Sequence, residues 1–171
     1  MYVLKFILLI AVFCTSTIIG VLISKKYSTR VQILKELKNA LNIFEVKINF
    51  SFETITEIFN EIAQKTNGIA GKIFEDSVKN IEQENMLAGE AWDKSIDANS
   101  ENLKSEDISC LKTLGKLLGK TDVEGQINQI KLVSTFLEKQ ISEADEEKHK
   151  NGKMYQKLGA VVGLIIVIVL I

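Results

Sequence analysis

The stretch GKLLGKT, Gly115–Thr121, decides between two fold classes. Gly-Lys-Thr after an upstream glycine is typical of the loop that binds nucleotide phosphates in α/β NTPases, where the full pattern is G-x-x-x-x-G-K-[ST]. In this chain only three residues separate Gly115 from Gly119, and Leu114 occupies the position that requires the first glycine. The spacing is therefore wrong for a phosphate loop.

The residues on both sides of this stretch have the features of helices. Upstream, in SEDISCLKTL (105–114), Ser105 is a suitable N-cap and acidic residues occupy the first turn. Apolar residues recur there every three positions, at Ile108, Leu111 and Leu114. Downstream, Thr121 and Glu124 have the spacing of a capping box. The stretch predicts a helix that ends near Gly119, a tight turn, and a final helix that begins at Thr121, with no nucleotide site.

Composition indicates the same all-α class. The chain has 171 residues and no proline, which fits long uninterrupted helices because proline breaks helix interiors. Its formal net charge of -1 argues against a basic face for nucleic acid. Cys14 and Cys110 lie far apart and lack zinc or redox spacing. The single histidine, His149, lies in the charged run EEKHK and is expected to be solvated. We expect no nucleic-acid partner, metal, cofactor or small-molecule substrate.

Apolar residues at helical spacing fill the middle of the chain. They predict helices over about 29–49 and 54–65, around 73–81 and 87–96, and over 105–118 and 121–150. The pair Asn67–Gly68 marks a turn between the second and third of these. No segment alternates like a strand, so a helical bundle with one core is the simplest way to bury the apolar faces.

Two apolar segments flank this bundle. FILLIAVFCTSTIIGVLI, Phe6–Ile23, has no charge and is long enough to span a bilayer as a helix. A cleaved signal peptide is the alternative, but no A-x-A cleavage pattern supports it. LGAVVGLIIVIVLI, residues 158–171, is short for a span, although neighbouring lysines can snorkel, and a buried strand is the alternative. We expect an N-terminal transmembrane helix and flank over 1–24, a bundle domain over 25–154, and a C-terminal transmembrane segment over 155–171.

Basic residues border both apolar segments on the side that faces the middle of the chain. They are Lys25, Lys26 and Arg30 after the first segment, and Lys148, Lys150, Lys153 and Lys157 before the second. Positive residues next to a membrane span stay on the cytoplasmic side. The bundle is therefore expected in the cytoplasm, with both termini outside.

The segment LAGEAWDKSI, residues 87–96, holds the candidate partner-binding residues. Trp92 is interpreted first as a core anchor, and second as a partly exposed contact for a protein partner. The acidic residues beside it are interpreted first as a solvated face, and second as a patch that attracts a basic partner. The candidates are Glu90, Trp92, Asp93 and Asp97. Elsewhere, Glu45 is either a boundary residue or a buried polar group that holds a helix contact.

Four segments give the chain a resemblance to the stage III sporulation protein AB family of endospore-forming bacteria. They are residues 34–63 with an E-x-x-I-x-[YF] turn, GEAWDKSI at 89–96, the run L-x-x-L-G-x-x-L-G-x-[ST]-D-x-x-x-Q at 111–126, and the tail from Glu146. Together they cover nearly the whole chain, and the last two are the most specific. One departure lies at residues 53–56, Glu-Thr-Ile-Thr, where the family tends to have prolines.

The resemblance implies a structural role for the opening stretch. Gly115 and Gly119 would allow close helix approach, and Thr121 and Asp122 would start the final helix. Gln126 ends the same motif, and Glu45 begins the E-x-x-I-x-[YF] turn. Any nucleotide would then belong to a partner.

The resemblance also implies a function. The soluble region is similar to the helical cytoplasmic domains of the inner-membrane platform protein of type II secretion and type IV pilus systems. The expected role is a non-enzymatic platform in the secretion-like channel between mother cell and forespore, on the mother-cell side in the outer forespore membrane. Expected partners are the membrane, a secretion-type ATPase, other stage III sporulation channel proteins and, as a homo-oligomer, further copies of the chain. A membrane-anchored sensor is the alternative, and an NTPase is less favoured.

Overall fold

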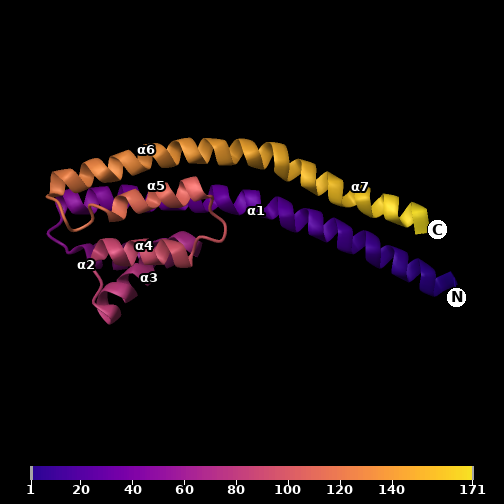
Figure 1. Ribbon diagram of the computed structural model, residues 1–171, viewed down its shortest axis with the longest axis horizontal. Coiled ribbons are helices and arrows are strands. Elements are labelled where there is room, and N and C mark those ends of the chain that lie inside the picture. Colours follow the sequence, from indigo (N-terminus) through magenta and orange to yellow (C-terminus); the bar gives the residue numbers. More distant parts are fainter. Residues whose placement is uncertain (1, 171) are drawn as a thin grey trace. The chain divides into compact units, whose positions relative to one another are not determined.

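The computed structural model describes residues 2–170, and each element in that range is a helix (Figure 1). The all-α prediction is confirmed. The elements are α1 (Tyr2–Phe50), α2 (Ile55–Lys65), α3 (Gly68–Glu84), α4 (Ala88–Ala98), α5 (Ser105–Gly115), α6 (Val123–Glu147), the π-helical turn η1 (Lys148–Gly152) and α7 (Lys153–Leu170). Contacts divide the chain into two compact units, one comprising Met1–Val31 with Glu143–Ile171 and the other comprising Gln32–Ser142.

Helix α1 contains two segments that the sequence analysis predicted as separate helices. It carries the N-terminal apolar segment and the helix predicted over 29–49 as one element of 49 residues. The residues that connect them, SKKYS at 24–28, contain neither glycine nor proline, so nothing in them ends a helix. The helix ends at Phe50, and residues 51–54 form an irregular connection to α2.

Four aromatic side chains from four helices form the centre of the unit Gln32–Ser142. Phe44, Phe59, Phe74 and Trp92 come from α1, α2, α3 and α4 and are fully buried. The ring centroid of Phe59 lies 5.2 Å from that of Phe44, 5.0 Å from that of Phe74 and 5.6 Å from that of Trp92. Ring pairs at such spacings contribute about 0.5–1.5 kcal/mol each beyond their burial. The cluster therefore holds α1 to α4 together around Phe59.

Helices α5 and α6 complete the core of this unit. Their buried apolar residues include Leu111, Leu114, Ile130, Val133 and Leu137. The spacing of three or four positions places these residues on one face of each helix. At the exposed edge, Lys38 of α1 and Glu138 of α6 form an ion pair of 2.6 Å. Exposed pairs contribute at most about 1 kcal/mol, so the apolar contacts hold α6 in place.

The positions at which α5 and α6 begin differ from two sequence predictions. Lys104, and not Ser105, is the N-cap of α5, because the Asp107 carboxylate accepts the Lys104 N–H at 2.9 Å. Asp122, and not Thr121, caps α6, because Asp122 Oδ1 accepts the Gly125 N–H at 2.9 Å. In both places an acidic side chain satisfies the free N–H group and also suits the positive end of the helix dipole.

In the other compact unit, α1 packs against the end of the chain through small residues. A Cβ atom on Gly20 would lie 2.7 Å from the Tyr155 carbonyl oxygen and 2.9 Å from the Cα atom of Gly159. Ser16 Oγ donates a hydrogen bond of 2.8 Å to the Gly159 carbonyl oxygen. The rings of Tyr27 and Tyr155 stack with centroids 6.0 Å apart. Contacts through glycine and a serine hydroxyl are typical of helix pairs within membranes.

The outer faces of these two helices are apolar. Exposed side chains there include Ile10, Ile19, Leu22, Ile165 and Val169. Two helical stretches, Ile7–Phe50 and Val123–Leu170, are long and apolar enough to cross a membrane by length and composition. The predicted pair of apolar helices at the two ends of the chain is confirmed. The π-helical turn η1 lies where the final polar helix meets the second apolar one.

Candidate functional site

The stretch Gly115–Thr121 connects two helices. Helix α5 ends at Gly115, four residues before the end expected near Gly119. Two turns follow, closed by hydrogen bonds from Leu117 N–H to the Leu114 carbonyl oxygen at 3.3 Å and from Lys120 N–H to the Leu117 carbonyl oxygen at 3.0 Å. Gly119 has a φ of 72°, in the left-handed region that favours glycine. The order is helix, turn, helix, whereas a phosphate loop joins a strand to a helix.

Two glycines permit a close contact between α4 and α5. A Cβ atom on Gly89 would overlap the Gly115 carbonyl oxygen, and one on Gly115 would overlap Oδ1 of Asp93 and lie 2.9 Å from the Gly89 carbonyl oxygen. Gly119 makes no comparable approach, because a Cβ atom there would meet only Ile55 Cδ1 at 3.6 Å. Gly115 therefore lies in a helix contact, and Gly119 is needed for its backbone conformation.

Asp93 lies beside this glycine contact and is half-buried. Its Oδ1 atom has no hydrogen-bond partner among the described residues. Burial raises the pKa of the Asp93 carboxyl, the charge of Lys112 opposes this shift, and the charge of Asp97 adds to it. A carboxylate that is poorly solvated in the folded state costs free energy at neutral pH. Such residues often have a functional role, so Asp93 stays among the candidates for partner binding.

Trp92 belongs to the core. Its side chain is fully buried, and its Nε1 atom donates a hydrogen bond of 2.9 Å to the Leu111 carbonyl oxygen. The interpretation as a partly exposed contact is therefore wrong, and the core-anchor interpretation describes its position. Glu90 and Asp97 are exposed, and Asp97 forms an ion pair of 2.7 Å with Lys112.

Glu45 and Gln126 are both half-buried at the edge of the helical unit. Glu45 Oε1 lies 3.7 Å from Nζ of Lys131 on α6. Gln126 Nε2 donates a hydrogen bond of 3.2 Å to the Thr121 carbonyl oxygen, and its Oε1 atom has no partner among the described residues. Glu45 thus occupies a boundary position, and Gln126 braces the turn that precedes α6.

The end of α1 and the connection to α2 expose two aromatic side chains that sequence reasoning missed. The relative exposure is 80% for Phe50 and 109% for Phe52, and Val46, one turn before Phe50, is 59% exposed. Grouped large apolar side chains on a surface indicate an interaction site. The available signal is that Phe50 and Phe52 lie in the short stretch between the helices predicted over 29–49 and 54–65.

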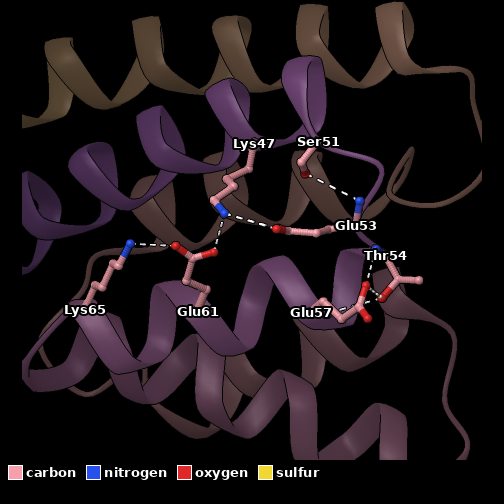
Figure 2. Close-up of polar contacts among 7 residues, drawn as sticks. All are labelled: Lys47, Ser51, Glu53, Thr54, Glu57, Glu61 and Lys65. Atoms are coloured by element: carbon pink, nitrogen blue, oxygen red, sulfur yellow. Dashed lines mark hydrogen bonds and ion pairs between the residues drawn. The ribbon is translucent and has the colours of Figure 1, made fainter.

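Polar contacts hold this connection in place, as Figure 2 shows. Lys47 pairs with Glu53 at 3.2 Å and with Glu61 of α2, so one ammonium group joins three segments. Hydrogen bonds to Glu61 and Glu53 raise the pKa of Lys47. At the start of α2, the Glu57 carboxylate accepts the Thr54 N–H at 2.7 Å. Phe50 and Phe52 therefore lie on an ordered turn. These two residues are called the aromatic pair.

Among residues 2–170, no group of three or more His, Cys, Asp and Glu side chains is placed to hold a metal ion. His149 is exposed, with Nε2 3.5 Å from Asp145 one turn earlier. Burial raises the pKa of the Cys110 thiol to about 11, and the charge of Asp107 adds to the effect. A thiol with this pKa is a poor nucleophile at neutral pH.

Comparison with known proteins identifies the family. The family described as stage III sporulation protein AB matches residues 5–171. The Stage III sporulation protein AB of Bacillus subtilis (strain 168) is 26% identical over 169 residues, which are 98% of this chain and 99% of that protein. A solved structure of Stage III sporulation protein AB (SpoIIIAB) has a fold similar to that of this chain, with a TM-score of 0.66 and 23% sequence identity. The match covers 71% of this chain and 98% of the solved one. The chain therefore belongs to the stage III sporulation protein AB family.

Proposed function

We propose that the chain is a non-enzymatic platform of the sporulation channel between mother cell and forespore. Membership of the family supports the role in sporulation. The two apolar helices support anchoring in a membrane, for which we propose the outer forespore membrane. Basic residues border both apolar segments on the side of the helical unit, so we place that unit in the mother-cell cytoplasm.

The aromatic pair carries the docking part of this proposal. Exposed aromatic side chains are frequent anchors of protein interfaces. Phe50 and Phe52 follow the residue Lys47, whose ion pairs to Glu53 and Glu61 order the turn before any partner arrives. An ordered turn loses little conformational entropy on binding. We infer that an apolar pocket of a cytoplasmic secretion-type ATPase receives these two rings.

The acidic residues of α4 supply a second contact in this proposal. Glu90 and Asp97 are exposed, and Asp93 is half-buried between them in sequence. Exposed charges steer association more than they add affinity. We therefore expect Glu90→Gln and Asp97→Asn to slow association and to change its salt dependence, with a smaller effect on the lifetime of the complex.

Affinity recovery tests the docking proposal. The full-length chain is co-expressed with the ATPase of the sporulation channel and purified in detergent. Phe50→Ser with Phe52→Ser should lower the recovered ATPase about tenfold or more, as expected for loss of two interface anchors. The matched control is Leu87→Ser with Leu132→Ser, which removes two other exposed apolar side chains and should leave recovery unchanged. Equal recovery by both variants would exclude this turn as the docking site.

Photo-crosslinking in sporulating cells locates the partner independently. Probes at Phe52, Asp97 and Asn128 sample three exposed positions of the helical unit. We expect the ATPase to be recovered from Phe52, together with other channel proteins from the remaining probes. If all three probes gave only crosslinks between copies of the chain while the ATPase was present, a homo-oligomeric scaffold would replace the docking proposal.

A further inference from the structure

A groove lined by positive side chains lies within the unit formed by Met1–Val31 and Glu143–Ile171. Its volume is about 330 Å³, and α1, η1 and α7 all contribute to its lining. Lys25 comes from α1, Lys148 from η1 and Lys153 from α7. Ser24 and Ser28, which carry hydroxyl groups, belong to the same lining. The groove thus combines three ammonium groups with hydrogen-bond donors.

Three of the four basic side chains that line this groove have no ion pair among the described residues, 2–170. Lys25, Lys148 and Lys153 form no ion pair in that range, whereas Arg30 and the lining residue His149 each lie close to a carboxylate. Arg30 lies 3.1 Å from Glu147, and His149 lies 3.5 Å from Asp145. Ammonium groups gathered in one groove repel one another. A bound anion would relieve that repulsion and would accept their hydrogen bonds.

An irregular stretch of backbone forms part of the groove lining. The π-helical turn Lys148–Gly152 interrupts the regular helix between α6 and α7, and such turns are frequent at functional sites. Gly152 is buried, and a Cβ atom there would lie 3.3 Å from Ser24 Oγ. The absence of a side chain at Gly152 therefore leaves room for the serine hydroxyl beside the lysines.

The position of the groove along the chain indicates which kind of anion it would bind. Ser24 directly follows the apolar segment Phe6–Ile23, and Lys153 lies five residues before the apolar run that begins at Leu158. Lipid phosphates lie at this level when the two helices span a bilayer. Val21, which also lines the groove, is 40% exposed and can contact an acyl chain. Basic pockets between membrane helices bind anionic head groups.

We propose that this groove binds the phosphate of an anionic phospholipid. Lys25, Lys148 and Lys153 contact the phosphate oxygens, the hydroxyls of Ser24 and Ser28 add hydrogen bonds, and the acyl chains lie against the apolar faces of the helices. The proposal requires the two apolar helices to lie in a bilayer, and it does not depend on the docking of an ATPase. A failed ATPase recovery would therefore leave it unaffected.

Native mass spectrometry of the full-length chain released from nanodiscs tests the proposal. The nanodiscs contain phosphatidylcholine with a minority of phosphatidylglycerol, and the readout is the lipid that stays bound. We expect phosphatidylglycerol to be retained in preference to phosphatidylcholine. Lys25→Ala with Lys148→Ala and Lys153→Ala should lower its retention about tenfold or more, since each lysine near an anionic head group favours binding. The same three positions changed to arginine should retain the lipid.

A matched control distinguishes lipid binding at this groove from a general effect of positive charge on the protein. Lys35→Ala with Lys72→Ala and Lys120→Ala removes three exposed charges from the other unit and should leave lipid retention unchanged. Equal retention of phosphatidylglycerol by the groove variant would overturn the proposal. Displacement of bound lipid by inorganic phosphate, without preference for phosphatidylglycerol, would overturn the lipid assignment in favour of a soluble phosphate. If the triple variant failed to insert, the single changes to glutamine would decide: partial loss in each supports the site, and no loss in any excludes it.

Discussion

The indole Nε1 of Trp92 lies 2.9 Å from the carbonyl oxygen of Leu111, so a side chain of α4 is hydrogen-bonded to the backbone of α5 inside the core. The same indole packs against Phe59 and Phe74, with ring centroids 5.6 Å and 5.1 Å away. Because Trp92 is the single tryptophan of the chain, its fluorescence reports on this core and on no other part of the protein.

Substitution of Trp92 tests how much of the stability depends on this position. Trp92→Ala should lower the free energy of unfolding of the helical unit by about 3–5 kcal/mol, because it leaves a large cavity. Trp92→Phe should cost less, about 1–3 kcal/mol, because it removes the hydrogen bond and only part of the volume. Pulse proteolysis of the full-length chain across a urea series measures both. The control Glu90→Ala, at an exposed position, should change stability by less than about 0.5 kcal/mol.

The burial of Trp92 also shows how far sequence alone determines this fold. Apolar residues repeat at helical spacing from Leu34 to Leu137, so helix identity followed from local pattern. The pattern could not choose between Thr121 and Asp122 as the cap of α6, because both are good N-caps. The structure identifies Asp122, because its Oδ1 atom accepts the Gly125 N–H.

The candidate sites were less accessible to sequence reasoning than the helices. The exposure of Phe50 and Phe52 depends on where α1 ends, and the polar contacts of Lys47 reach Glu61, which lies on another helix. The groove proposed to bind lipid is lined by Lys25 and by Lys148 and Lys153, which are far from Lys25 in the sequence. Their basic character was evident in the sequence, but their shared groove required the packing of α1 against α7.

The capping box of α2 gives a pH-dependent contribution to stability. Hydrogen bonds from the Thr54 N–H and hydroxyl lower the pKa of Glu57 below its ordinary value of 4.5. A lowered folded-state pKa stabilises the fold above the unfolded value, and this stabilisation is lost as the pH falls through the folded value. We expect Glu57→Gln to lower the Tm at pH 7, and the difference from the parent to shrink as the pH falls below 4.5.

Trp92 fluorescence during heating at several pH values measures this difference. Glu82→Gln is the matched control, since Glu82 is an exposed glutamate on α3, and it should leave the Tm difference near zero at each pH. A Tm difference for Glu57→Gln that stayed constant down to pH 3 would show that the charge of Glu57 does not act through the cap.

Asp93 should give a pH dependence of stability opposite in sign to that of Glu57. Burial raises the pKa of its carboxyl, so the folded chain binds the proton more tightly than the unfolded chain and loses stability as the pH rises through this range. Asp93→Asn should therefore raise the Tm at pH 7, and the gain should vanish toward acidic pH. Asp97→Asn, which removes an ion pair to Lys112, should give no gain. A lower Tm for Asp93→Asn at pH 7 would mean that the surrounding lysines stabilise the carboxylate more than burial disfavours it.

The buried thiol of Cys110 should resist alkylation in the folded protein. Its pKa of about 11 leaves only about a thousandth of the thiol ionised at pH 8, and the thiolate is the reactive form. In a Cys14→Ala background Cys110 is the single thiol. A maleimide should modify it rapidly in urea and at least about a hundredfold more slowly without urea. Equal rates in the two conditions would indicate that this part of α5 opens readily.

The contact between Gly20 and Gly159 should decide whether the two apolar helices pair. A Cβ atom on Gly159 would lie 2.9 Å from the Cα atom of Gly20 and from the Ser16 carbonyl oxygen, so Gly159→Leu must separate the helices. Cysteines placed at Ser24 and Gly152 report on the pairing. A Cβ atom on Gly152 would lie 3.3 Å from Ser24 Oγ, which is short enough for a disulfide between cysteines at the two positions.

The crosslink is formed by mild oxidation of the full-length chain in nanodiscs, with Cys14 and Cys110 changed to alanine. Proteolysis between the two helices followed by electrophoresis, with and without reductant, shows whether the fragments are joined. The parent should crosslink in high yield, and Gly159→Leu should abolish most of it. Val162→Leu adds bulk at an exposed position of the same helix and should keep the yield. Ser16→Ala should reduce it only slightly, since a single hydrogen bond between membrane helices contributes about 0.6 kcal/mol. An unchanged yield in Gly159→Leu would show that the glycine contact does not hold the pair together.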